Sequence, residues 1–221
     1  MDDMTVSLLV VLITAIIIGG IFVLVYYRKR NSQQLLINLA TQKGWRYEKV
    51  NDRTTSGYRL YGPQWVFEGL HETSESGSNS GSSNIRAYTR WYSTQVNFTP
   101  GILLIGPKQP EINLGGISDV LKQAMLKLMV GDEADAALGI EESLIGRMAL
   151  RERYMVWTNQ EEKARDILSP EVENALIRYP GKIPPVVKFN AKGIELKLIS
   201  QHLQKPAEIE GLVAIGMAFL L

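Results

Sequence analysis

One segment has glycines and a lysine near the spacing of a phosphate-binding loop. Gly101 and Gly106 are separated by four residues, and Lys108 follows two positions later. A phosphate-binding loop needs Lys directly after the second Gly and then Ser or Thr. Here Pro107 intervenes, and the four spacers are Ile, Leu, Leu and Ile. A short, continuous apolar run is typical of a buried strand, so we predict a strand at residues 101–106.

The two histidines of the chain, His71 and His202, are its best candidates for acid–base chemistry near neutral pH. His71 is followed by Glu72 at the end of an expected strand, which could form an acid/base pair. A lone surface histidine is the commoner interpretation of both positions. A nucleophilic serine is not expected either, because Asn79 stands at the central position of the Gly-Ser-Asn-Ser-Gly segment. No catalytic residue is therefore predicted.

Acidic residues cluster in one segment and could attract a divalent cation: Asp132, Glu133, Asp135, Glu141 and Glu142. The alternating Asp/Asn ligands, central Gly and terminal Glu of a calcium loop are missing. A solvated loop or a frayed helix is the favoured interpretation. The chain has no cysteine, which excludes thiolate metal sites and disulfides. No metal and no cofactor are predicted.

Tryptophans and arginines are interleaved in a way that resembles a single-strand nucleic-acid platform: Trp45, Trp65, Trp91 and Trp157 with Arg46, Arg86 and Arg90. Packing within a sheet explains the tryptophans more simply, and Glu48 and Glu68 dilute any basic field. The whole chain has 24 Lys and Arg against 23 Asp and Glu, a formal charge of +1. Nucleic-acid binders usually carry a clear basic excess, so no nucleic-acid partner is predicted.

The candidate residues lie on predicted strands and helices or in the segments that join them. Alternating or apolar patterns predict strands at 45–50, 58–62, 65–71, 85–99, 101–106, 153–158, 186–190 and 193–200. Helical spacing predicts helices at 32–44, 117–131 and 205–221, with further starts at Thr158 or Asn159 and at Ser169. In the long strand at 85–99, Tyr88, Tyr92, Val96 and Phe98 are expected to share a face. The fold class predicted is α+β, with a mainly antiparallel sheet packed by amphipathic helices.

Residues 5–27 carry no charge and are rich in Leu, Val, Ile and Phe. At about 1.5 Å per residue a helix of this length crosses a ~30 Å hydrocarbon core. A cleaved signal peptide is the main rival, but its cations come first and a small-residue cleavage site follows. We therefore predict a short extracytoplasmic N-terminus at 1–4, a transmembrane helix at 5–27, a juxtamembrane helix or stalk at 28–44, and a domain at 45–221 with a flexible Ser/Gly loop at 72–84.

The flanks of this run predict its orientation. Arg28, Lys29 and Arg30 follow it, whereas no Lys or Arg precedes it. The positive-inside rule then predicts a single-pass protein of the cell (inner) membrane, with the N-terminus outside and the large domain in the cytoplasm. Tyr26 and Tyr27 suit the membrane–water interface, where the ring stays apolar and the hydroxyl reaches water.

A small-xxx-small pair lies inside the run. Ala15 and Gly19 would let two membrane helices approach closely, which makes a homodimer through this face one alternative. The other is that small residues are simply frequent in membrane helices.

The segment from Tyr154 to Leu176 resembles part of a known group of sequences. A "YMVW" strand, Ala164-Arg165 on a short helix and "ILSPEVENAL" are similar to the C-terminal part of single-pass, membrane-anchored bacterial proteins with a cytoplasmic domain of unknown function. "GWRYEK" just after an anchor and a short helix is similar as well. The resemblance implies a bacterial, membrane-attached cytoplasmic domain, and it supplies no catalytic or binding residue.

The function predicted is a non-enzymatic, membrane-anchored interaction or scaffold module. Its partners would be the lipid bilayer and another membrane or cytosolic protein. Two alternatives remain open. One is a membrane-tethered enzyme whose polar residues converge only in three dimensions. The other is a lipid-contacting module that uses an exposed apolar face on the last helix, residues 209–221. A helix docked on the sheet is the favoured interpretation of that segment.

Overall fold

The computed structural model describes residues 14, 17, 18, 20, 26, 30–75, 83–108 and 139–221. It contains a helix at residues 30–43 and then these elements: β1 (Arg46–Asn51), β2 (Thr55–Tyr61), β3 (Val66–Glu75), β4 (Ser83–Ser93), β5 (Leu103–Pro107), β6 (Glu141–Ser143), α3 (Met148–Arg153), β7 (Tyr154–Thr158), α4 (Glu161–Ile167), α5 (Pro170–Ile177), β8 (Val186–Asn190), β9 (Gly193–Ile199) and α6 (Pro206–Ala218). The predicted helix at 117–131 lies outside the described residues.

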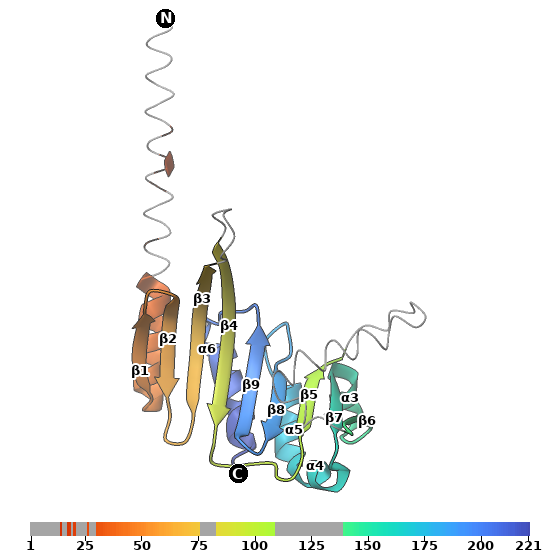
Figure 1. Ribbon diagram of the computed structural model, residues 1–221. Helices are drawn as coiled ribbons and strands as arrows, with labels where there is room; N and C mark the ends of the chain where they lie inside the picture. The colour runs from red at the N-terminus through yellow and green to blue at the C-terminus, as the bar shows by residue number, and fades with distance from the viewer. Residues whose placement is uncertain are drawn as a thin grey trace, which may run out of the picture.

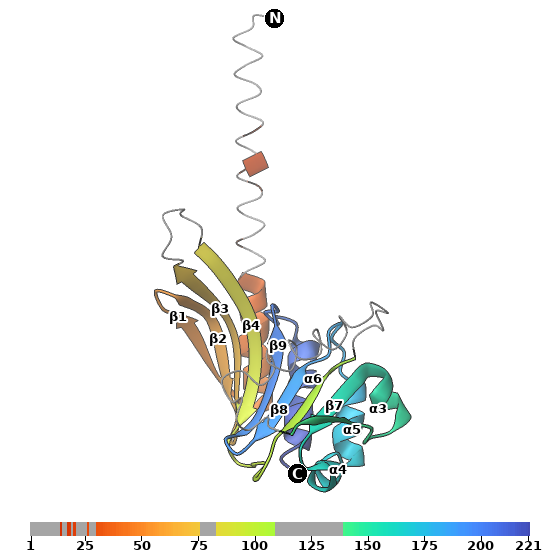
Figure 2. The ribbon, with the colours of Figure 1, turned by 45° about the vertical axis from the view of Figure 1, so that its right-hand side comes forward.

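Within the described ranges, the strands form one nine-stranded sheet in the order β1-β2-β3-β4-β9-β8-β5-β7-β6, and every pair of neighbouring strands is antiparallel. The helix of residues 30–43, α5 and α6 lie on one face of this sheet (Figures 1 and 2). The predicted α+β class with a mainly antiparallel sheet packed by helices is confirmed. None of the described helices is both long and apolar enough to cross a membrane. The predicted span at 5–27 falls almost entirely outside the described residues.

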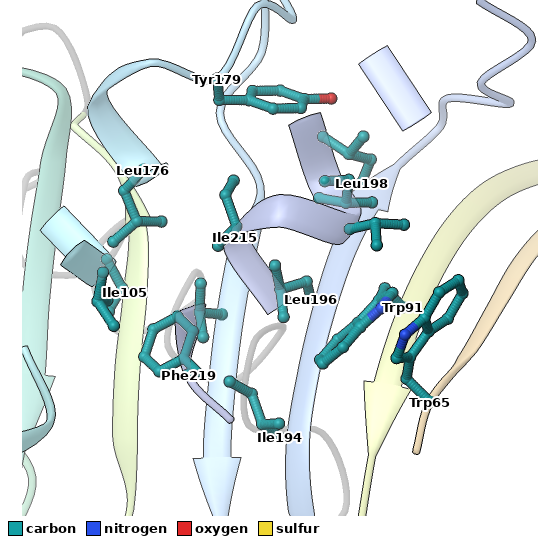
Figure 3. Packing of buried hydrophobic residues seen from close by; sticks show 14 of the residues in the cluster. Trp65, Trp91, Ile105, Leu176, Tyr179, Ile194, Leu196, Leu198, Ile215 and Phe219 are labelled. Atoms are coloured by element: carbon teal, nitrogen blue, oxygen red, sulfur yellow. The ribbon is translucent and has the colours of Figure 1, made fainter. Parts of the chain in front are cut away.

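The hydrophobic core lies between the sheet and these helices (Figure 3). Trp91 from β4, Leu196 from β9 and Ile215 from α6 are each fully buried there. The helix of residues 30–43 contributes Leu36 and Ala40 to the same core. Burying side chains of this size stabilises the fold by about 1.5–3 kcal/mol each. This helix is therefore fixed to the sheet.

Local signals place most element boundaries. Gly44 ends the helix of residues 30–43 with a φ of +69°, a conformation that glycine adopts without steric cost. The side chain of Ser169 accepts a hydrogen bond from the Val172 backbone N–H, and Pro170 occupies the first turn of α5, as predicted. The strands predicted at 186–190 and 193–200 pair with each other as the β8–β9 hairpin.

The predicted helix caps at Thr158 and Asn159 were wrong. The N-cap of α4 is Gln160, which makes no side-chain capping bond. Asn159 Oδ1 instead accepts a hydrogen bond from the Ile102 backbone N–H, and Thr158 Oγ1 donates to the Ile102 carbonyl. Both side chains thus join the end of β7 to the segment before β5. In a capping box the side chain accepts from the backbone N–H three residues on, whereas Thr158 Oγ1 accepts from that of Gln160, two residues on.

Two other sequence-based interpretations are corrected. The strand predicted to run through residue 99 ends at Ser93, and Phe98 leaves the sheet to pack in the core, with its ring centroid 5.8 Å from that of Phe189. It does not share the face of Tyr88 and Tyr92. The end of the acidic segment is a strand rather than a loop, because Glu141–Ser143 pairs with β7 as the sheet's last strand.

Candidate interaction face

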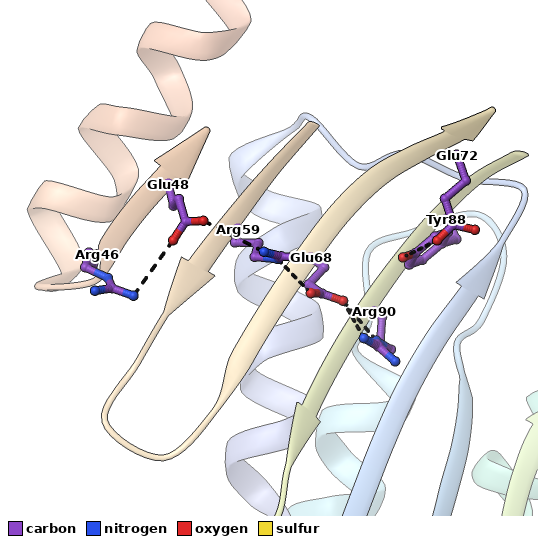
Figure 4. Close-up of polar contacts among 7 residues, drawn as sticks. All are labelled: Arg46, Glu48, Arg59, Glu68, Glu72, Tyr88 and Arg90. Atoms are coloured by element: carbon purple, nitrogen blue, oxygen red, sulfur yellow. Dashed lines mark hydrogen bonds and ion pairs between the residues drawn. The ribbon is translucent and has the colours of Figure 1, made fainter. Parts of the chain in front are cut away.

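A row of opposite charges crosses four neighbouring strands on the face of the sheet that the described helices leave uncovered (Figure 4). The strand register sets Glu48 opposite Arg59, Arg59 opposite Glu68, and Glu68 opposite Arg90. Side chains directly opposite in antiparallel strands lie about 5 Å apart at Cβ, so each pair can interact. The register alone therefore builds a charge ladder from strands β1 to β4.

Glu68 is the centre of this ladder and is only 3% exposed. Its Oε1 lies 2.8 Å from Arg59 Nε, and its Oε2 lies 2.6 Å from an Arg90 terminal nitrogen and 3.1 Å from Arg90 Nε. Burial alone would lower the pKa of Arg90, but the hydrogen bonds and charge of Glu68 outweigh it, and the pKa is raised. The Glu68 carboxylate thus bridges the guanidinium groups of the two neighbouring strands.

The outer end of the ladder is looser. Glu48 lies 3.8 Å from Arg59 and 3.9 Å from Arg46, and the Arg46 side chain is 70% exposed. The Arg46 guanidinium lies 4.1 Å from the centre of the Tyr61 ring, a cation–π contact. Exposed ion pairs at such distances contribute about 0–1 kcal/mol, so Arg46 can exchange Glu48 for another carboxylate at little cost.

Tyrosines flank the ladder on the same face. The Arg90 guanidinium lies 4.6 Å from the centre of the Tyr92 ring, and the Tyr88 hydroxyl donates to Glu72 over 3.0 Å. Burial, with the adjacent Glu72, raises the pKa of Tyr88 to about 12. We call this surface the open face and define it by Arg46, Glu48, Arg59, Tyr61, Glu68, Glu72, Tyr88, Arg90, Tyr92 and Lys197.

The structure brings the two histidines together, and no local sequence pattern predicts this contact. The ring centroids of His71 and His202 lie 4.3 Å apart on the helix-covered side of the sheet. His202 Nε2 lies 3.1 Å from the Gly69 carbonyl oxygen, which can only accept, so the neutral ring carries its proton there. His202 Nδ1 is then free to accept from the Gln204 side chain at 3.1 Å.

The environment of His202 favours the neutral ring. Burial lowers its pKa to about 4, with His71 lowering it further and the hydrogen bond to Gly69 opposing both. Both ring nitrogens of His202 are engaged, so neither is free to exchange a proton with a substrate. The pair holds the segment between β9 and α6 against β3.

This segment gives a pH-dependent prediction. The folded pKa of His202 lies below the ordinary value of about 6.5, so the unfolded chain binds more protons between pH 4 and 6.5. The free energy of unfolding should therefore fall by roughly 2 kcal/mol as pH drops through this window, after discounting for partial solvent exposure.

The measurement is urea unfolding of the full chain in detergent micelles, followed by tryptophan fluorescence from pH 4 to 8. The comparison variant is His202→Gln, which does not titrate, so carboxylates that titrate in both proteins cancel in the difference. Parallel curves for the two proteins between pH 6.5 and 4 would contradict the assignment.

The other candidate residues are not gathered into a site. The sequence at 101–106 is strand-like as predicted, and Ile102 to Ile105 are fully buried. Trp65, Trp91 and Trp157 are buried, so their rings are closed to stacking bases. Asp132, Glu133 and Asp135 lie outside the described residues, as does the centre of the Ser/Gly loop. In the described ranges no three His, Asp or Glu side chains are grouped to hold a metal ion.

Of the residues predicted at the membrane interface, two are described. Tyr26 is 63% exposed, and Arg30 is exposed as the first residue of the continuous helix. The predicted interface residues Tyr27, Arg28 and Lys29, and the predicted dimer face of Ala15 and Gly19, lie outside the described residues.

The lipid-contacting alternative for the last helix is overturned. That interpretation required an exposed apolar face on residues 209–221, but Ile209, Leu212 and Ile215 are fully buried, and Phe219 is 7% exposed. The ring of Phe219 contacts Phe189 of β8 edge to face, with centroids 6.2 Å apart. The apolar side chains of α6 are therefore those with which the helix packs on the sheet.

Over the part of the chain that the structure describes, fold and site together define an α+β domain whose antiparallel sheet has one helix-covered face and one open, polar face. No family model matches the chain, and no curated protein matches its sequence. Among solved structures, the crystal structure of the mycobacterial trehalose monomycolate transport factor A, TtfA, is similar at 13% identity and a TM-score of 0.38. The alignment covers 82% of this chain and 89% of that one.

Proposed function

We propose that this chain is a non-enzymatic, single-pass membrane protein of the cell membrane, whose cytoplasmic domain binds a protein partner through the open face. The observation that carries the binding role is the ladder of Glu48, Arg59, Glu68 and Arg90 across an uncovered sheet face. The proposed anchor is the uncharged run at 5–27, followed by Arg28, Lys29 and Arg30, which orient the domain toward the cytoplasm.

The composition of the open face favours a protein as the partner. Tyrosine and arginine are enriched at the centres of protein interfaces, where they contribute most of the binding energy. Carboxylates alternate with the cations, and these carboxylates would repel the phosphates of a nucleic acid. Complementary alternating charges on a partner protein would bind this pattern and fix its register.

Arg46, Tyr61 and Tyr92 are the residues that we propose contact the partner. Arg46 is held by one distant carboxylate and one ring, whereas Glu68 is already saturated by two arginines. The ion pairs of Glu68 thus hold the strands of the open face in place, and the residues at the edges of the ladder contact the partner.

The test is site-specific photocrosslinking in membranes with the full-length protein. A photoreactive amino acid replaces Tyr61 or Tyr92 on the open face, and a control places it at Asp166, which is exposed on α4. We expect one protein, identified by mass spectrometry, to crosslink from both tyrosine positions and not from position 166. Adding Arg46→Glu should reduce the yield several-fold.

Equal crosslinking of that protein from position 166 would contradict the open face as the binding surface. A failure to capture any protein from either tyrosine position would contradict the binding role. The matched charge control is Arg165→Glu, on the exposed side of α4, and it should leave the yield unchanged.

A further inference from the structure

Several segments meet at the end of the sheet where the helix of residues 30–43 begins, drawn uppermost in Figure 1. Ser32 at the start of that helix bonds to Gln204 over 3.2 Å. The Thr73 backbone N–H donates to the Thr54 carbonyl oxygen over 2.8 Å, which brings the β1–β2 turn to the end of β3. We call this surface the upper end and define it by residues 30–32, 52–54, 71–73, 85–86 and 202–205.

The upper end carries exposed cations and one exposed apolar side chain. The exposed cations are Arg30, Arg53, Arg86 and Lys205. The exposed carboxylates described there are Asp52 and Glu72, and Glu72 already accepts from Tyr88 and lies opposite Arg86. Lys205 Nζ lies 3.0 Å from a carboxylate oxygen of Glu208, and the Lys205 side chain is 77% exposed. Ile85 is 68% exposed. Cations beside an exposed aliphatic side chain suit a lipid headgroup region.

The first residues of the upper end follow closely in sequence on the predicted membrane segment. The uncharged run of residues 5–27 ends three residues before Arg30, with Arg28 and Lys29 between. We propose that the upper end rests on anionic phospholipid headgroups, with Arg53 and Arg86 binding phosphates and Ile85 entering the interface. This proposal rests on the membrane anchor of the proposed function.

The packing of residues 30–43 makes this contact persistent. Leu36, Leu39 and Ala40 are buried in the core, and Lys43 pairs with Glu210 of α6 at 3.4 Å. The sheet therefore cannot move independently of the helix that begins at Arg30, three positions after the uncharged run. Electrostatic attraction to a charged surface fades within about 10 Å, so a fixed upper end gains it and the opposite end does not. Each cation held there favours contact about fivefold.

The experiment measures how close two labelled positions lie to lipid. Because the chain lacks cysteine, Ile85→Cys and Ala191→Cys each give one labelling site. Ala191 is exposed in the β8–β9 turn, at the opposite end of the sheet (Figure 1). The full-length protein is reconstituted in vesicles of phosphatidylcholine, alone or mixed with phosphatidylglycerol, that contain lipids with a spin-labelled headgroup. Quenching of a fluorophore at each position is then measured.

We expect quenching at position 85 to exceed that at position 191 several-fold in the anionic vesicles. It should fall toward the position-191 value in phosphatidylcholine alone, and also with Arg53→Glu and Arg86→Glu combined. The matched control, Arg151→Glu with Arg165→Glu, reverses two exposed cations away from the upper end and should change nothing.

Two results would overturn the lipid contact while leaving the anchor intact. The first is equal quenching at positions 85 and 191 in protein that floats with the vesicles. The second is quenching at position 85 that does not depend on phosphatidylglycerol. Protein that fails to float with vesicles of either composition would overturn the anchor, and with it this contact.

Discussion

Replacing Gly216 by valine is expected to destabilise the domain by about 3 kcal/mol, because α6 could no longer lie against β4. A carbon added at Gly216 would stand 2.4 Å from Cε2 and Cζ2 of Trp91. Trp91 is fully buried, and its ring centroid lies 6.3 Å from that of Trp65, so the indole has nowhere to move. The helix itself would have to shift, which would open the core in Figure 3.

The matched control is Ala214→Val, which introduces the same side chain at an exposed position of the same helix. This substitution should lower the free energy of unfolding only by the difference in helix propensity between alanine and valine, about 0.5 kcal/mol. Urea unfolding of the full chain in detergent micelles measures both variants. Equal stability of the two would show that α6 does not depend on close contact with Trp91.

Replacing Glu68 by alanine is expected to cost about 2 kcal/mol, the second large effect. Removing one partner of a buried ion pair typically costs about 3–5 kcal/mol, because the other charge is left uncompensated. Here the side chains of Arg59 and Arg90 are 33% and 36% exposed, so water compensates part of the loss. What remains is the repulsion of two cations on adjacent strands and their lost hydrogen bonds.

A double-mutant cycle separates the ladder's core from its outer end. We expect a coupling energy above about 1 kcal/mol between Glu68 and Arg90. The coupling between Glu48 and Arg46 should be near zero, since that pair is exposed and 3.9 Å apart. A coupling of similar size for both pairs would contradict the view that burial of Glu68 fixes the face.

The ladder also explains why a polar sheet face can be stable without a second layer. Opposite charges in register satisfy each other across strands, and the Tyr92 ring of the open face lies against the Arg90 guanidinium. To the proposed protein partner, such a face would present a fixed pattern of donors and acceptors. Its rigidity reduces the ordering cost of binding.

Local patterns were sufficient for most elements. The alternation around Tyr47 and Tyr88 predicted strands, the Ser169-Pro170 pair predicted the start of α5, and the apolar run before Arg28 predicted a membrane segment that stays a prediction. Such signals depend on residues close in the chain, and period-2 or period-3.6 patterns report which side of an element is buried.

The candidate sites could not be predicted in the same way. His71 and His202 are 131 positions apart (202 − 71) and meet only because β4 pairs with β9, which brings the segment after β9 across the inner face of β3. No local pattern records that pairing. Each histidine by itself has the sequence signature of a surface residue.

The sequence by itself determined the composition, the strand and helix patterns, the uncharged run and the charges that follow it. It also determined which residues alternate on each strand, and so which side of β3 carries Glu68. Only the tertiary structure decided that Glu48, Arg59, Glu68 and Arg90 stand in one row and that α6 is a core helix. The physical reason is that strand order and register arise from long-range burial around Trp91 and its neighbours, whereas charge and periodicity are properties of the chain alone.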